Sequence, residues 1–144
     1  MANVFVKICA GLIVLRSFTN FSKLLQGDDT VLVMLGRILH GREVVAPAVV
    51  VGIFMLATGV MLWRGGRAAL PLITTYAAYV AANLLLWVVV HPGELETVGR
   101  RLSSATDPAT LRSIGGWAHA GYCVVALATT AGPAWMLWRR QRYT

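Results

Sequence analysis

Long runs of apolar residues, separated by short polar segments, divide the chain into four stretches of membrane-spanning length. A helix needs about 20 mostly apolar residues to cross the hydrocarbon core of a bilayer. The sequence predicts four such helices, at residues 3–23, 44–63, 68–90 and 114–138. The predicted fold class is therefore all-α: a polytopic membrane protein, a four-transmembrane-helix bundle, in which residues 1–144 form a single membrane domain.

Between the first two spans, apolar residues recur with the spacing of an amphipathic helix. From Thr30 to His40 they stand at positions i, i+1, i+3, i+4, i+7 and i+8. Residues 28–30 offer a helix cap, and Gly41 offers an end. Because this segment is too short to cross a bilayer, the pattern predicts an amphipathic interfacial helix on the outer surface, or one folded over the bundle as a lid.

The second long loop, residues 91–113, begins with a His-Pro-Gly turn. It is expected to hold one short helix at residues 94–102. Asp107 followed by Pro108 is typical of a helix start, with proline at the first helical position. Pro133 is expected to kink the last span.

Composition supports a lipid environment. Charged residues make up 13% of the chain, against about 25% in an average soluble domain. The net charge of +7 could suggest a nucleic-acid partner, but the basic residues flank apolar runs instead of forming a basic groove, so no nucleic-acid binding is expected. The lipid bilayer is the expected partner, together with other membrane subunits or a second copy of the chain.

The charges between the spans are sorted by sign. With four spans, both termini and the turn at residues 64–67 share one side of the membrane, which carries no acidic residue. Basic residues crowd against the span ends on that side, and such residues mark the cytoplasmic face. They are Lys7, Arg64, Arg67, Arg139, Arg140 and Arg142. We therefore expect a multi-pass plasma-membrane protein, in a bacterium an inner-membrane protein, with both termini cytoplasmic.

Polar side chains of three predicted helices fall at one depth in the outer half of the bilayer. At about 1.5 Å per residue, Arg16 lies roughly 21 Å from Ala2, and Asn83 and His119 lie roughly 8–10 Å below the outer ends of their helices. Polar groups at membrane depth usually face the interior of a bundle. The predicted ligand-binding residues at or beside this level are Arg16, Asn20, Tyr79, Asn83, His119 and Tyr122.

Two interpretations of this level remain open. In the first, the polar groups satisfy each other, and Arg16 reaches the outer headgroups or meets Glu43 or Glu94 from a loop. In the second, they form a pocket open to the outer leaflet, whose guanidinium binds an anionic or carbonyl-bearing ligand. A lipid phosphate, a quinone or an acidic metabolite would each suit it. No catalytic residue is predicted, and whether the chain is an enzyme stays open.

Three histidines, His40, His91 and His119, lie toward the outer side, near the carboxylates. Imidazole and carboxylate ligands can bind zinc or copper, but no pair of these histidines has a ligand spacing. His91 and His119 flank one loop and could in principle approach each other as haem ligands. Metal and haem are therefore weak alternatives, and no cofactor is predicted.

Short matches resemble a family of small four-helix membrane proteins, the anthrone-oxygenase-like predicted membrane proteins. They comprise Pro47, Thr58-Gly59 and Leu62 in the second span, Trp117 with His119 in the fourth, and the linker with Asp107-Pro108 and Leu111-Arg112. The chain departs from the family at residues 91–94, where the family has an asparagine-rich turn, and in its shorter Trp–His spacing. The resemblance implies a bundle that handles a hydrophobic aromatic or quinone-like compound, and it carries over no catalytic residue.

Two functions are predicted from these patterns. The first is an accessory or interaction subunit of a larger membrane complex, because the chain is small and its spans carry ridges of small residues such as Ala78 and Ala82. The second is a small membrane enzyme or carrier that binds a lipophilic or quinone-like ligand at the level of Arg16, Asn83 and His119.

Overall fold

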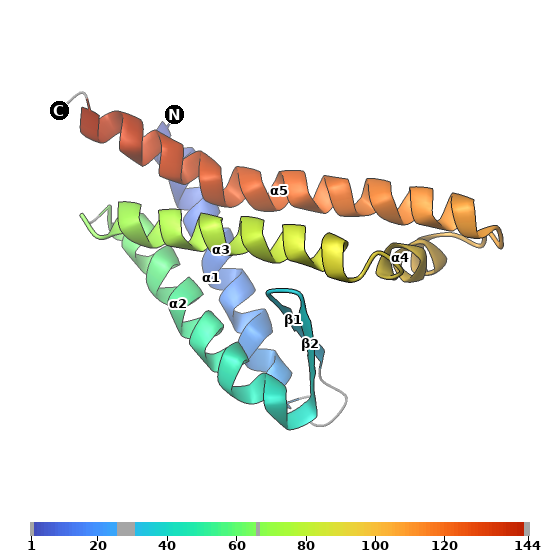
Figure 1. Ribbon diagram of the computed structural model, residues 1–144. Coiled ribbons are helices and arrows are strands. Elements are labelled where there is room, and N and C mark those ends of the chain that lie inside the picture. The colour runs from blue at the N-terminus through green and yellow to red at the C-terminus, as the bar shows by residue number, and fades with distance from the viewer. Residues whose placement is uncertain (1, 26–30, 66, 143–144) are drawn as a thin grey trace.

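A computed structural model describes residues 2–25, 31–65 and 67–142 of the chain (Figure 1). Within them lie five α-helices and one β-hairpin. The helices are α1 (Ala2–Ser22), α2 (Val45–Arg64), α3 (Ala69–Val90), α4 (Glu94–Leu102) and α5 (Pro108–Arg142). The strands are β1 (Val31–Met34) and β2 (Arg37–His40), and short 3-10 turns, η1 (Lys23–Leu25) and η3 (Gly41–Val44), flank the segment between α1 and α2.

The four predicted spans are confirmed as helices. In the described part of the chain, α1, α2, α3 and α5 are each long and apolar enough to cross a membrane, and the structure is 85% helical. α5 is longer than predicted, since its 35 residues begin at Pro108 and continue through Pro133. A helix of that length extends about 52 Å, well beyond the roughly 30 Å of a hydrocarbon core.

The helices form two pairs that meet at one end and diverge at the other. α1 packs along α2, and α3 packs along α5. Figure 1 shows both chain ends and the α2–α3 turn at the end where the pairs meet, and the hairpin where they diverge. The buried core lies toward the end where the two pairs meet. There Ala10 of α1, Leu62 of α2 and Ile73 of α3 are almost fully buried.

Close contact between α1 and α2 depends on small residues. A Cβ atom at Gly59 would lie 3.0 Å from the Ala10 carbonyl oxygen, and one at Gly52 would lie 2.9 Å from the ring of Phe21. Ala48, one turn before Gly52, is fully buried. Small residues of this kind allow two helix backbones to approach closely in a membrane.

The predicted interfacial helix at residues 30–40 is wrong. Residues 31–40 form an antiparallel hairpin in which Val31 pairs with His40 and Met34 with Arg37. Its two-residue turn, Leu35-Gly36, has positive φ at both positions (48° and 76°), as the tight turn typical of β-hairpins requires. A helical stripe and two short strands with β-branched residues cannot be told apart over a segment of ten residues, and contacts with α3 decide the outcome. The predicted cap at residues 28–30 lies outside the described residues.

The short helix predicted in the second loop is confirmed as α4, which lies against the first turns of α5. The two backbones touch at glycines: a Cβ atom at Gly115 would overlap the carbonyl oxygen of Leu95, and one at Gly99 would overlap that of Leu111. Glu96 adds an ion pair at 2.7 Å to Arg100 and one at 3.7 Å to Arg112 of α5. α4 and the first turns of α5 lie beyond the C-terminal end of α3 (Figure 1).

Asp107 caps α5, as the Asp-Pro pair predicted. Its Oδ2 accepts hydrogen bonds from the backbone N–H and the hydroxyl of Thr110, each at 2.9 Å. These bonds, first the one from the backbone, hold the pKa of Asp107 below its ordinary value. The carboxylate form is therefore favoured by the folded helix.

We expect this cap to weaken in acid. Because the pKa is lowered in the folded state, the cap contributes fully above the unfolded-state pKa and is lost as the pH falls through the folded-state value. Amide exchange at Thr110, corrected for its intrinsic pH dependence, should accelerate several-fold over that range. Asp107→Ala should give the fast rate at every pH, and Asp107→Asn should keep the cap without the pH dependence. If the exchange rate of the Thr110 amide changes neither with pH nor in the Asp107→Ala variant, Asp107 does not cap α5.

Candidate functional site

A cavity of about 510 Å³ lies between the two helix pairs, next to the hairpin. This volume is within the range of small-molecule sites, roughly 300–1,000 Å³. The structure brings all the predicted ligand-binding residues to its lining: Arg16, Asn20, Tyr79, Asn83, His119 and Tyr122. The convergence of these side chains is thus observed, whereas their binding of a ligand stays a prediction.

The side chains from α1 form the most polar wall. Arg16, Thr19, Asn20 and Lys23 are spaced by three or four residues, so one helical face carries them all. The guanidinium carbon of Arg16 lies 5.2 Å from the centroid of the Tyr122 ring of α5, within the range of a cation–π contact. Asn20 is buried, and its Nδ2 lies 3.1 Å from the sulfur of Met55 on α2.

Aromatic rings form the wall between α3 and α5. The Trp87 indole stacks on the His119 imidazole, with ring centroids 4.7 Å apart and planes 25° apart. His119 Nε2 in turn lies 3.3 Å from the Cys123 sulfur, one turn along α5. On α3, Tyr79 stacks with Tyr76 at 6.5 Å. The Trp87 ring and the Cys123 sulfur together position His119 at the edge of the cavity.

Asn83 has a structural task that the sequence did not reveal. Its Oδ1 accepts a hydrogen bond of 2.6 Å from the backbone N–H of Leu35, at the tip of the hairpin. Two turns further along α3, His91 Nε2 lies 2.9 Å from the carbonyl oxygen of Gly36. The hairpin is thereby attached to α3 at both residues of its turn and lies over the cavity, where Leu32 contributes to the lining.

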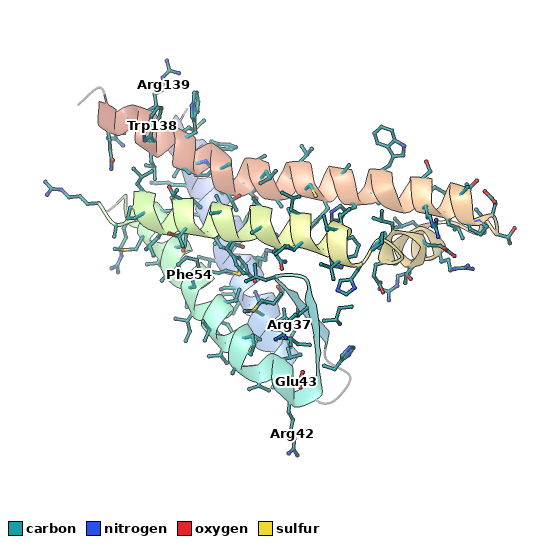
Figure 2. The ribbon with its side chains drawn as sticks, in the orientation of Figure 1. Arg37, Arg42, Glu43, Phe54, Trp138 and Arg139 are labelled. Carbon is teal, nitrogen blue, oxygen red and sulfur yellow. The ribbon has the colours of Figure 1, made fainter. Side chains whose placement is uncertain are left out.

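Neither predicted carboxylate partner reaches Arg16. Glu43 lies at the base of the hairpin, within η3 (Figure 2), and Glu94 begins α4. Within residues 2–25, 31–65 and 67–142, no Asp or Glu belongs to the lining of the cavity. The first interpretation of the polar level offered Glu43 or Glu94 as an ion-pair partner of Arg16. The structure does not bring either carboxylate to Arg16.

Some lining residues were missed as site residues although the sequence held a signal for them. Lys23 continues the Arg16–Asn20 face by three residues, and Trp87 follows Asn83 by four on α3. Leu32 had no such signal, because its place depends on the hairpin that the sequence did not predict.

The three histidines do not converge. His40 ends β2, His91 contacts the hairpin turn, and His119 stacks on Trp87. Among the described residues there is no group of three or more His, Cys, Asp or Glu side chains that could hold a metal ion. The alternative of a metal site at His40, His91 and His119 therefore has no support from the geometry.

No family model matches this chain, and no curated protein and no solved structure shows significant similarity to it. The resemblance to anthrone-oxygenase-like proteins thus depends on hydropathy and the short matches alone.

Proposed function

We propose that this protein is a multi-pass membrane protein that binds a lipophilic ligand with a polar head in the cavity between its helix pairs. One observation carries the proposal: polar side chains from α1, α3 and α5 line a single cavity together with apolar residues. A few placed polar groups in a largely apolar pocket are the usual form of a ligand site.

The surface of the helices supports placement in a bilayer. Large apolar side chains are exposed along three of the candidate spans, among them Leu15 on α1 (63%), Leu85 on α3 (67%) and Val124 on α5 (68%). Soluble monomers rarely expose such continuous apolar surface. With the basic turn and tail in the cytoplasm, the cavity lies in the outer half of a plasma membrane, the inner membrane in a bacterium.

The lining fits a ligand with an acceptor-rich head. Arg16, Asn20 and the two tyrosine hydroxyls of Tyr79 and Tyr122 can all donate hydrogen bonds. The α2 wall, formed by Val51 and Met55, offers an apolar surface. Lipid-derived molecules and quinone-like compounds both combine such a head with an apolar body.

Filling the cavity should weaken binding. Leu84→Trp adds bulk to the lining, and we expect it to weaken binding about tenfold or more, equivalent to about 1.4 kcal/mol. The probes are dodecanol, dodecanoate, dodecyl phosphate and a decyl-benzoquinone. Each is titrated into the full chain in phosphatidylcholine nanodiscs, with the bound ligand counted by native mass spectrometry.

Leu85→Trp is the matched control, because Leu85 is the next residue on α3 and is exposed away from the cavity. It should bind the preferred probe like the wild type. If no probe binds the wild type, or if Leu84→Trp binds it unchanged, the proposed function is wrong.

A second candidate, the accessory subunit of a larger complex, is favoured by one surface. Ala78 and Ala82, four residues apart on α3, are both exposed, so this ridge is open to a further helix. The same mass spectra report the mass of the assembly. A chain that always runs alone at low expression in mild detergent would argue against this candidate.

A further inference from the structure

We infer that the cavity takes an anionic amphiphile, a single acyl chain that ends in a carboxylate or a phosphate bound by Arg16. The inference rests on the proposed function, because it names the class of ligand that the same cavity accepts. It follows from the charge of the lining, the surroundings of Arg16, and the shape and opening of the cavity.

Among the described residues, the lining carries positive charge without negative charge. Arg16 and Lys23 are both part of it, and no carboxylate of the described ranges is. Lys23 has a contact of its own, so the argument depends on Arg16. Within the described part of the chain, the ring of Tyr122 is the partner of the Arg16 guanidinium, which has neither an ion pair nor a hydrogen-bond acceptor there.

An arginine whose guanidinium contacts an aromatic ring but no carboxylate needs an anion if it lies within the membrane. Placing a charged side chain at the centre of a spanning helix costs about 2.5–3.5 kcal/mol on insertion scales. The contact with the Tyr122 ring offsets a part of this, about 0.5–2 kcal/mol. A neutral carbonyl would leave the positive charge in place, whereas a carboxylate or phosphate would neutralise it and accept hydrogen bonds from the planar guanidinium.

The neighbours of Arg16 suit the rest of an anionic head. Thr19 and Asn20 stand three and four residues further along the same face of α1 and also line the cavity. The Asn20 amide has one N–H near the Met55 sulfur and can donate the other to an oxygen atom of the head, whereas the Thr19 hydroxyl donates to the carbonyl oxygen of Arg16 at 2.7 Å. An anionic head at Arg16 would thus meet several donors on one wall.

The apolar part of the lining suits an acyl chain. Val51 and Met55 of α2, with Val80 and Leu84 of α3, present only apolar atoms and a thioether. A volume of 510 Å³ suits a drug-sized molecule, which favours one chain with its head over a two-chain phospholipid.

The polar wall is open to the surroundings of the bundle. Arg16 and Tyr122 both line the cavity and are both exposed, Tyr122 by 46%. They belong to α1 and α5, so the opening lies between these two helices. In a bilayer this opening faces lipid, and an amphiphile can enter from the outer leaflet with its head toward Arg16.

The test compares heads on a constant chain. Dodecanoate, dodecyl phosphate and dodecanol are titrated at pH 8 into the full chain in phosphatidylcholine nanodiscs. We expect at least one anion to bind tenfold or more tightly than dodecanol, since a hydrogen bond to a charged group contributes about 1.5–3 kcal/mol. Preference for dodecanoate would indicate a free fatty acid as the source of the head, and preference for dodecyl phosphate a phosphate monoester.

Arg16→Gln should remove the preference for the anion, so that dodecanoate and dodecyl phosphate bind no more tightly to this variant than dodecanol does. Arg16→Lys keeps the positive charge and should keep part of the preference for the anion. Arg139→Gln is the matched control, because the Arg139 guanidinium also lies over an aromatic ring, that of Trp135 at 5.5 Å. Arg139 is at the other end of α5 from the cavity (Figure 2), so its variant should keep the preference.

Two results would overturn the inference while leaving the proposed function intact. One is dodecanol or the quinone binding as tightly as both anions. The other is an anion preference that survives Arg16→Gln. If no amphiphile binds at all, the proposed function fails first and the inference falls with it.

Discussion

Replacing Gly115 with alanine is expected to separate α4 from α5. The new Cβ atom would occupy the position of the Leu95 carbonyl oxygen, which belongs to the backbone and cannot move as a side chain can. Overpacking of this kind costs about 3 kcal/mol, so α4 should open far more often. Arg100 and Arg101, both exposed on α4, provide the readout, and tryptic cleavage there should accelerate by roughly one to two orders of magnitude.

The control for this variant is the next residue. A Cβ atom at Gly116 would meet nothing within 4 Å, and alanine is the better helix former. Gly116→Ala should therefore be cleaved no faster than the wild type. Cleavage of Gly115→Ala at the wild-type rate would show that α4 does not lie on α5 as described.

Replacing Asn83 with leucine is expected to release the hairpin from α3. The substitution removes the acceptor of the Leu35 N–H bond, an interaction with a net contribution of about 0.5–1.5 kcal/mol. Hydrogen exchange of the Leu35 amide should accelerate by up to about tenfold. The contact between His91 and Gly36 remains and limits how far the turn can move.

Ala82→Leu tests whether added bulk on α3 explains the effect. Ala82 precedes Asn83 and is exposed, so leucine there should leave the exchange of Leu35 unchanged. If Asn83→Leu also leaves it unchanged, the hydrogen bond does not hold the hairpin.

The helices could be predicted because each depends on a property of its own segment. Apolar length defined α1, α2 and α3 to within one or two residues. It placed the start of α5 too late, because Thr110, Arg112 and Ser113 interrupt the apolar run there, whereas the helix already begins after the Asp107 cap. The hairpin could not be predicted. Its ten residues fit a helix equally well, and the contacts of Leu35 with Asn83 and of Gly36 with His91 span about fifty residues of sequence.

The site could be predicted in part for a related reason. Helical spacing and depth were sufficient to bring Arg16, Asn83 and His119 to one level, and the structure places all three around one cavity. Spacing gives no information on which atoms pair. The use of the Asn83 oxygen by the hairpin and the stacking of His119 on Trp87 depend on how the two helix pairs diverge.

Leu35 shows which contacts keep the hairpin over the cavity. Among the described residues it is the one non-glycine with a positive φ, 48°, and a left-handed backbone disfavours such a residue by roughly 1–2 kcal/mol. The hydrogen bond that its N–H makes to Asn83 contributes roughly 0.5–1.5 kcal/mol, which offsets about this cost. The cover over the cavity is therefore imposed by the contacts with α3 and with His91, and not by the intrinsic preference of the turn.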